Sequence, residues 1–192
     1  MMGELDKLYS NINSKVPISL EDFQDLATYF KPLTVKKKST LIQEGEYNDR
    51  LFFVEKGLLY LYKVLQDGDI QVIQFAKEDY WVSDLCSFFS GSRTLFSVQA
   101  LEDSTLYSLS KNDFDAICLD FPGMETFFRL SFQSAYITTL IRLSDAYSQD
   151  TETKYSRISD ESADLLQRVP QYLIASYLGV LPSSLSRIRT KK

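Results

Sequence analysis

The chain has no histidine among its 192 residues. Histidine is the commonest metal ligand and general base, and its side chain ordinarily titrates near neutral pH. Its absence excludes a metal or haem held by histidine and removes the usual pH switch. We therefore expect no metal, no cofactor and no enzymatic activity.

Cysteine is also scarce, with only Cys86 and Cys118 present. Two thiols provide neither a disulfide framework nor the four ligands of an iron–sulfur cluster, so we expect both to be buried and reduced. No stretch reaches the roughly 18 consecutive apolar residues of a membrane span, and the N-terminal sequence lacks the apolar core of a signal peptide. These absences predict a cytoplasmic protein with no membrane partner.

Charge is distributed unevenly along a chain whose net charge is −5. Residues 154–192 carry seven Lys/Arg and three Asp/Glu, whereas residues 1–153 carry fourteen and twenty-three. A solubilising tail has no need to reverse the sign of its own protein, but DNA binding requires positive charge at the contact. The distribution therefore predicts an anionic partner for the C-terminal segment.

Residues 169–192 have the spacing of two short helices that meet at small side chains. Ala175 would lie inside the first helix, where a larger side chain would push the second helix away. Gly179 stands at the turn, where glycine adopts a positive φ without steric cost. Pro182 suits the first position of the second helix because its φ is already helical. The spacing predicts a helix-turn-helix; the alternative is a hairpin that only closes a domain.

The outward side of the second helix carries short hydroxyls and guanidinium groups. These groups suit phosphates and base edges, and double-stranded DNA is the partner that they indicate. They belong to Ser183, Ser184, Ser186, Arg187 and Arg189.

Residues 33–110 consist of short runs rich in β-branched and aromatic residues, separated by turn sequences. The QDGD sequence at residues 66–69 gives the clearest hairpin signal. Seven or eight strands without a long helix between them predict an antiparallel barrel or jelly roll. A helix over residues 19–30 should precede the strands, with Ser19 and Asp22 at its start.

Helical periodicity returns over residues 111–121 and, after Pro122 and Gly123, over residues 124–148. The longer helix has two apolar sides, which suggest two partners: the barrel and a second copy of the chain. The alternative is burial of the helix within one chain. Residues 149–160 are expected to form a polar joint. We assign the dimer side to Phe127, Leu130, Ile137 and Ile141, and note the other side at Phe128, Phe132, Leu140, Leu143 and Tyr147.

Residues 38–75 resemble the first half of the cyclic-nucleotide-binding barrel of the Crp/Fnr family of bacterial transcription regulators. The sequence LLQRVPQYLIASYLGV is similar to the branch of this family that is common in Bacteroidetes. The resemblance covers residues from about 20 to 192. The matching barrel positions are Leu41, Ile42, Gly45, Glu46, the apolar run to Val54, Gly57, Asp67 and Gly68.

The resemblance implies an α+β fold in three parts. A cyclic-nucleotide-binding-like antiparallel β jelly-roll barrel with an N-terminal helix would occupy residues 1–121. A long dimerisation helix would occupy residues 122–149, and a helix-turn-helix DNA-binding domain residues 150–192. The implied function is transcription regulation by a homodimer that reads a near-palindromic DNA site, with RNA polymerase as a further partner.

Three positions match the base-reading face of the family: Pro182, Ser183 and Arg187. Of these, Arg187 alone can read guanine through two hydrogen bonds, which discriminates between bases by roughly 1–3 kcal/mol. Many relatives have longer polar side chains at the other two positions, so their site preference cannot be transferred. Phosphate contacts are then expected from Arg189, Lys191, Lys192 and Gln171.

The ligand pocket departs from the nucleotide binders of the family. Those proteins use a Gly-Glu pair for the ribose and an Arg-Ser or Arg-Thr pair for the cyclic phosphate, where this chain has Ser83-Asp84 and Thr94-Leu95. Arg93 is one position early, which reverses its face on a strand. A small-molecule effector would differ from cyclic AMP, or the barrel would be structural. The residues expected at the pocket are Ser83, Asp84, Leu85, Arg93, Thr94 and Leu95.

Two other functions fit parts of the pattern. A cupin-type enzyme shares the jelly-roll signal, but such enzymes generally hold a metal through histidines, which this chain lacks. A ligand-binding or protein-interaction module, with terminal helices that bind a protein partner, fits the modest base-reading content of Pro182, Ser183 and Ser184.

We expect cyclic AMP not to bind tightly, because the anion contacts of the family are replaced by apolar side chains. Isothermal titration calorimetry with cyclic AMP tests this expectation. A dissociation constant in the micromolar range would contradict it.

Overall fold

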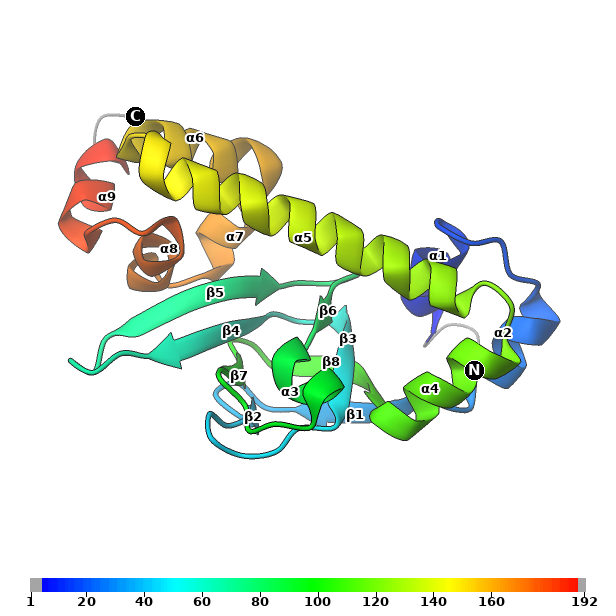
Figure 1. Ribbon diagram of the computed structural model, residues 1–192. Coiled ribbons are helices and arrows are strands. Elements are labelled where there is room, and N and C mark those ends of the chain that lie inside the picture. The colour runs from blue at the N-terminus through cyan, green and yellow to red at the C-terminus, as the bar shows by residue number, and fades with distance from the viewer. Residues whose placement is uncertain (1–4, 190–192) are drawn as a thin grey trace. The chain divides into compact units, whose positions relative to one another are not determined.

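The computed structural model describes residues 5–189 (Figure 1). The chain divides into two compact units. The first contains residues up to Leu61 together with Phe75–Gln133, and the second contains Tyr62–Gln74 and the residues from Ser134 onward. Within the described range, no helix combines the length and apolar character that crossing a membrane requires.

Eight strands form two four-stranded sheets, with strand orders β1-β8-β3-β6 and β2-β7-β4-β5. The pairs β1–β8, β3–β8, β3–β6 and β2–β7 are antiparallel, which confirms the predicted jelly-roll pattern. The QDGD turn joins β4 to β5, as expected. The strands are β1 (Lys31–Val35), β2 (Thr40–Ile42), β3 (Arg50–Lys56), β4 (Leu59–Val64), β5 (Ile70–Ala76), β6 (Trp81–Val82), β7 (Ser97–Ala100) and β8 (Ser104–Ser110).

Helices precede, interrupt and follow the sheets, giving the expected α+β fold. The predicted start at Ser19 is confirmed, because its hydroxyl accepts a hydrogen bond from the N–H of Asp22 at 3.0 Å. The helices are α1 (Asp6–Asn13), α2 (Leu20–Ala27), α3 (Leu85–Ser90), α4 (Lys111–Asp120), α5 (Met124–Ser148), α6 (Thr151–Glu161), α7 (Ala163–Arg168), α8 (Gln171–Leu178) and α9 (Pro182–Arg189).

Two expectations about local structure were wrong. Residues 149–160 are not a polar joint, because most of them form α6, which begins where Asp150 accepts a hydrogen bond from the N–H of Thr153 at 2.8 Å. Both cysteines are free, as expected, but Cys86 is exposed and Cys118 only half-buried. Cys86 lies on the short helix α3, which the sequence did not predict.

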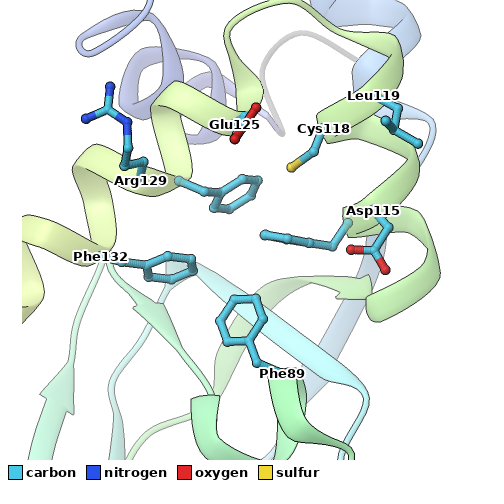
Figure 2. A pocket seen from close by; sticks show the side chains of 9 residues that line it. Phe89, Asp115, Cys118, Leu119, Glu125, Arg129 and Phe132 are labelled. Carbon is cyan, nitrogen blue, oxygen red and sulfur yellow. The ribbon is translucent and has the colours of Figure 1, made fainter.

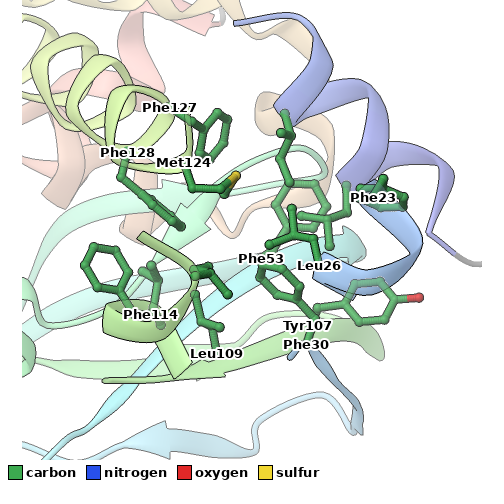
Figure 3. Packing of buried hydrophobic residues seen from close by; sticks show 14 of the residues in the cluster. Phe23, Leu26, Phe30, Phe53, Tyr107, Leu109, Phe114, Met124, Phe127 and Phe128 are labelled. Atoms are coloured by element: carbon green, nitrogen blue, oxygen red, sulfur yellow. The ribbon is translucent and has the colours of Figure 1, made fainter. Parts of the chain in front are cut away.

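The main core lies between one sheet and the helices of the first unit (Figure 3). Alternate residues of a strand point to opposite faces. Leu51 and Phe53 of β3 belong to this core together with Leu109 of β8. The helices contribute the remaining side chains, among them Leu8, Ile12, Phe23, Leu26, Phe114, Ile117, Met124, Phe127 and Phe128.

The β3–β4 connection requires glycine at position 57. Gly57 has φ +109°, and a Cβ atom there would lie 2.1 Å from the Ser104 Oγ and 2.8 Å from the Ser104 Cα. A side chain at this position would therefore combine backbone strain with a clash against β8.

Gly57→Ala is expected to lower the free energy of unfolding by about 2–4 kcal/mol, the sum of strain and overpacking. The matched control is Gly68→Ala, because Gly68 has φ +87° but no atom within 4 Å of the added Cβ. This control should lose only about 1–2 kcal/mol, the cost of the left-handed backbone alone. Urea unfolding of both variants provides the measurement, and equal losses would contradict the prediction.

Candidate nucleic-acid interface and barrel pocket

Two short helices, α8 and α9, occupy the segment that was predicted to form a helix-turn-helix. Ala175 has no exposed surface, and Leu185 of α9 is 1% exposed. Gly179 ends α8 in the left-handed conformation with φ +66°. Its N–H and that of Val180 donate to the carbonyl oxygens of Ser176 and Ala175 at 3.1 and 3.0 Å, the bonds of a Schellman motif. This end turns the chain sharply before α9.

The outward side of α9 carries the predicted polar residues. Pro182 is the first helical residue, as expected, and it is exposed together with Ser183, Ser186 and Arg187. Ser184 is half-buried. Gln171 is half-buried at the start of α8, Arg189 is the last residue of α9, and Lys191 and Lys192 lie outside the described residues.

Two further helices of the second unit support this pair. Tyr155 and Ile158 of α6 and Leu165 of α7 are buried, and α6 contacts α7, α8 and α9. These apolar side chains complete a small helical core that holds the turn between α8 and α9 in place. The sequence did not predict this support, because α6 is polar apart from its two inward residues.

Ser176 of α8 makes a contact that sequence reasoning missed. Its hydroxyl donates to the carbonyl oxygen of Ile70 at 2.5 Å and accepts from the N–H of Val72 at 2.9 Å. Both partners belong to the β5 segment of the same second unit. One serine thus satisfies one backbone acceptor and one backbone donor of strand β5. No local sequence pattern predicts hydrogen bonds between residues so far apart in the chain.

The residues assigned to the dimer side of α5 differ in their burial. Phe127 has no exposed surface and lies in the main core, with its ring 6.0 Å from that of Trp81, so its assignment to a dimer interface was wrong. Leu130 is half-buried, whereas Ile137 and Ile141 are 56% and 52% exposed. At the start of α5, residues of both apolar sides are buried in the core. Farther along the helix, residues of both sides are exposed.

Two of the expected pocket residues, Ser83 and Thr94, use their hydroxyl groups in hydrogen bonds within the barrel. The Ser83 hydroxyl donates to the carbonyl oxygen of Arg50 at 2.6 Å, and the Thr94 hydroxyl donates to that of Gln43 at 2.6 Å. Both side chains are buried, at 5% and 3% exposure. Their polar atoms therefore bind the framework of the barrel, and the assignment of these residues to a ligand pocket stays a prediction.

The other expected pocket residues are exposed, apart from Asp84. Arg93 donates to the carbonyl oxygen of Gly45 at 2.7 Å, and its guanidinium lies 5.0 Å from the centre of the Tyr47 ring. Leu85 and Leu95 are 36% and 48% exposed. Arg93 thus links its own segment to the loop before β3, and its assignment to a ligand pocket stays a prediction.

Asp84 is buried and bound entirely to the backbone. One carboxylate oxygen accepts from the N–H of Ser87 at 3.1 Å. The other accepts from the N–H groups of Leu95 and Phe96, at 2.6 and 3.0 Å. Its side chain links the start of α3 to the segment before β7.

A cavity of about 580 Å³ lies between α3, α4 and α5 in the first unit (Figure 2). Its walls are the rings of Phe89, Phe114, Phe128 and Phe132, whose neighbouring centres are 4.6–5.9 Å apart. Burial raises the pKa of the Cys118 thiol at its edge, so this thiol stays protonated near neutral pH. The four rings suit a ring-bearing molecule, and the charged side chains of Asp115, Glu125 and Arg129 also line the cavity.

Comparisons with known proteins identify the barrel. Residues 32–121 match the family described as the cyclic nucleotide-binding domain. A comparison with curated proteins found no match. Within the described residues, no group of His, Cys, Asp and Glu side chains could hold a metal ion.

Solved structures of transcription regulators share the fold. CLP of Xanthomonas campestris, described as a c-di-GMP responsive global regulator, matches with a TM-score of 0.72 and 12% identity over 88% of this chain and 89% of that one. A CooA variant from Carboxydothermus hydrogenoformans matches with a TM-score of 0.73 and 17% identity over 90% of this chain and 80% of that one. The catabolite activator protein of Thermus thermophilus matches with a TM-score of 0.58 and 15% identity over 94% of this chain and 85% of that one. Another matching structure is described as a proposed transcriptional regulator of the Crp/Fnr family from Eubacterium rectale. The similarity to a Bacteroidetes branch stays a prediction.

Proposed function

We propose that this chain is a DNA-binding transcription regulator of the Crp/Fnr type, which acts as a homodimer on a near-palindromic site. The observation that carries the proposal is the α8–α9 pair, in which Ala175 is fully buried and Ser183, Ser186 and Arg187 are exposed. The positive charge of the C-terminal segment and the fold shared with regulators support it.

In this proposal α9 enters the major groove with its N-terminal end. Arg187 reads guanine, the serine hydroxyls contact phosphates or bases, and Gln171 at the start of α8 contacts the backbone. Arg189, Lys191 and Lys192 add phosphate contacts. The short side chains of Pro182 and Ser183 give modest discrimination in each half-site, so specificity depends on two half-sites held at a fixed spacing. RNA polymerase is the proposed downstream partner.

The second half of α5 supports the proposed dimer. Ile137, Leu140 and Ile141 are 45–56% exposed, and their spacing places them along one side of the helix. Leu143, Tyr136 and Tyr147 extend the exposed apolar surface. A second copy of the same helix would cover this surface, with two-fold symmetry that matches a near-palindromic site.

We further propose an effector other than cyclic AMP. Near the positions where nucleotide binders hold the phosphate, Thr94 and Arg93 donate hydrogen bonds to backbone carbonyl oxygens of this chain, and Leu95 is exposed. The aromatic cavity between α3, α4 and α5 offers room for a ring-bearing effector and lies directly on α5. An effector there would contact the helix that carries the proposed dimer surface.

Arg187→Glu is expected to weaken binding to DNA fragments selected by the wild-type protein by roughly 10- to 100-fold, because it removes a base contact and adds repulsion. The control is Lys37→Glu, which makes the same change of charge at an exposed position between β1 and β2 and should have a smaller effect. Fluorescence anisotropy provides the measurement.

Wild-type affinity for mixed genomic DNA should also fall steeply between about 50 and about 200 mM salt. Absence of binding at low salt would exclude the proposal.

Replacing Ile137 and Ile141 together by Asp is expected to convert the dimer to a monomer, because four carboxylates would enter the apolar interface. Sedimentation velocity gives the oligomeric state. The control is Thr139→Asp, since Thr139 is exposed on the same helix but lies about 200° around it from each isoleucine. A wild-type protein that is monomeric at micromolar concentration, or a double variant that remains dimeric, would contradict the dimer.

A further inference from the structure

Two consecutive backbone N–H groups, those of Leu95 and Phe96, point at a single oxygen atom. That atom is the Oδ2 of Asp84, at 2.6 and 3.0 Å. We name these two N–H groups the amide pair. Adjacent N–H groups that converge in this way form an anion-binding concavity, because their partial positive charges add.

The occupant of the amide pair is buried and anionic. Asp84 is 1% exposed, and no Lys or Arg in the described part of the chain forms an ion pair with it. Burial of a carboxylate costs free energy unless hydrogen bonds to the charged form compensate for it. Here the amide pair provides that compensation, together with the N–H of Ser87 on Oδ1 at 3.1 Å. The local structure is therefore built to hold a negative charge at Oδ2.

We propose that Asp84 is a built-in anion that occupies the amide pair and closes this part of the barrel to phosphate-bearing ligands. A phosphate oxygen that bound at the amide pair would need the same two N–H groups, and it would meet the negative charge of the carboxylate. Thr94, which precedes the pair, offers no substitute because its hydroxyl donates to the carbonyl oxygen of Gln43. Asp84 is thus a specificity-determining residue that acts by exclusion. The proposal does not depend on DNA binding.

Removal of the carboxylate should convert the amide pair into an open anion site. In Asp84→Ala the N–H groups of Leu95 and Phe96 would lose their acceptor, and an unsatisfied buried donor destabilises the fold. A small anion that enters the vacated space would restore the acceptor. Ligand binding to the native state raises the melting temperature as the ligand concentration increases.

The test is rescue of Asp84→Ala by formate. The variant should melt below the wild-type protein, and about 100 mM sodium formate should raise its melting temperature by roughly 3–5 °C relative to sodium chloride of equal ionic strength. The wild-type protein and Asp103→Ala should show no such rise. Asp103 is the matched control, because it also accepts a backbone N–H, that of Lys37 at 2.8 Å, but is exposed to solvent.

Two further measurements keep the proposal testable if Asp84→Ala does not fold. The Asn side chain of Asp84→Asn fills the same space, so this variant should melt below the wild-type protein and should not be stabilised by formate. If formate stabilised it as much as a folded Asp84→Ala, the proposal would be overturned. In the wild-type protein, inorganic phosphate should leave the NMR signals of the Leu95 and Phe96 amides unchanged. Phosphate-dependent shifts of these two signals, or a folded Asp84→Ala that formate does not stabilise, would also overturn it.

Discussion

Burial of the first turns of α5 among aromatic rings is the interaction on which the rest of the first unit depends. Trp81 has its ring 5.1 Å from that of Phe53, 6.0 Å from Phe127 and 5.4 Å from Phe128, so it joins strand β3 to the helix. Removal of a buried aromatic side chain typically costs roughly 3–5 kcal/mol. This packing holds the first turns of α5 in the core of the first unit. Phe114 of α4, 4.6 Å from Phe128, shares the same cluster.

The same cluster connects packing with the proposed function. Phe89, Phe128 and Phe132 belong both to the aromatic contacts and to the walls of the cavity between α3, α4 and α5. A ring-bearing molecule in that cavity would exchange ring–ring contacts for ring–ligand contacts at little cost in burial. It would change the surroundings of α5 at the base of the segment that we propose as the dimer surface. In the proposed function, effector binding and the start of the dimer helix would therefore use one set of side chains.

The barrel keeps the architecture of a nucleotide-binding domain while its polar groups bind the protein itself. Ser83 and Thr94 donate to backbone carbonyl oxygens, Arg93 donates to Gly45, and Asp84 accepts from the amide pair. A barrel of this kind is complete without a nucleotide, which agrees with an effector of different chemistry.

Features decided by neighbouring residues were determined by the sequence alone. The QDGD hairpin, the start of α2 at Ser19, the left-handed Gly179 and the first-turn Pro182 each depend on local backbone conformation and local hydrogen bonds. The tertiary structure alone decided the features that join distant segments. Polar α6 became a helix that covers α8 and α9, and Phe127 entered the core although the apolar pattern placed it on the dimer side. Asp84 found its partners eleven and twelve residues away. Periodicity shows that a side is apolar, but only packing decides what covers it.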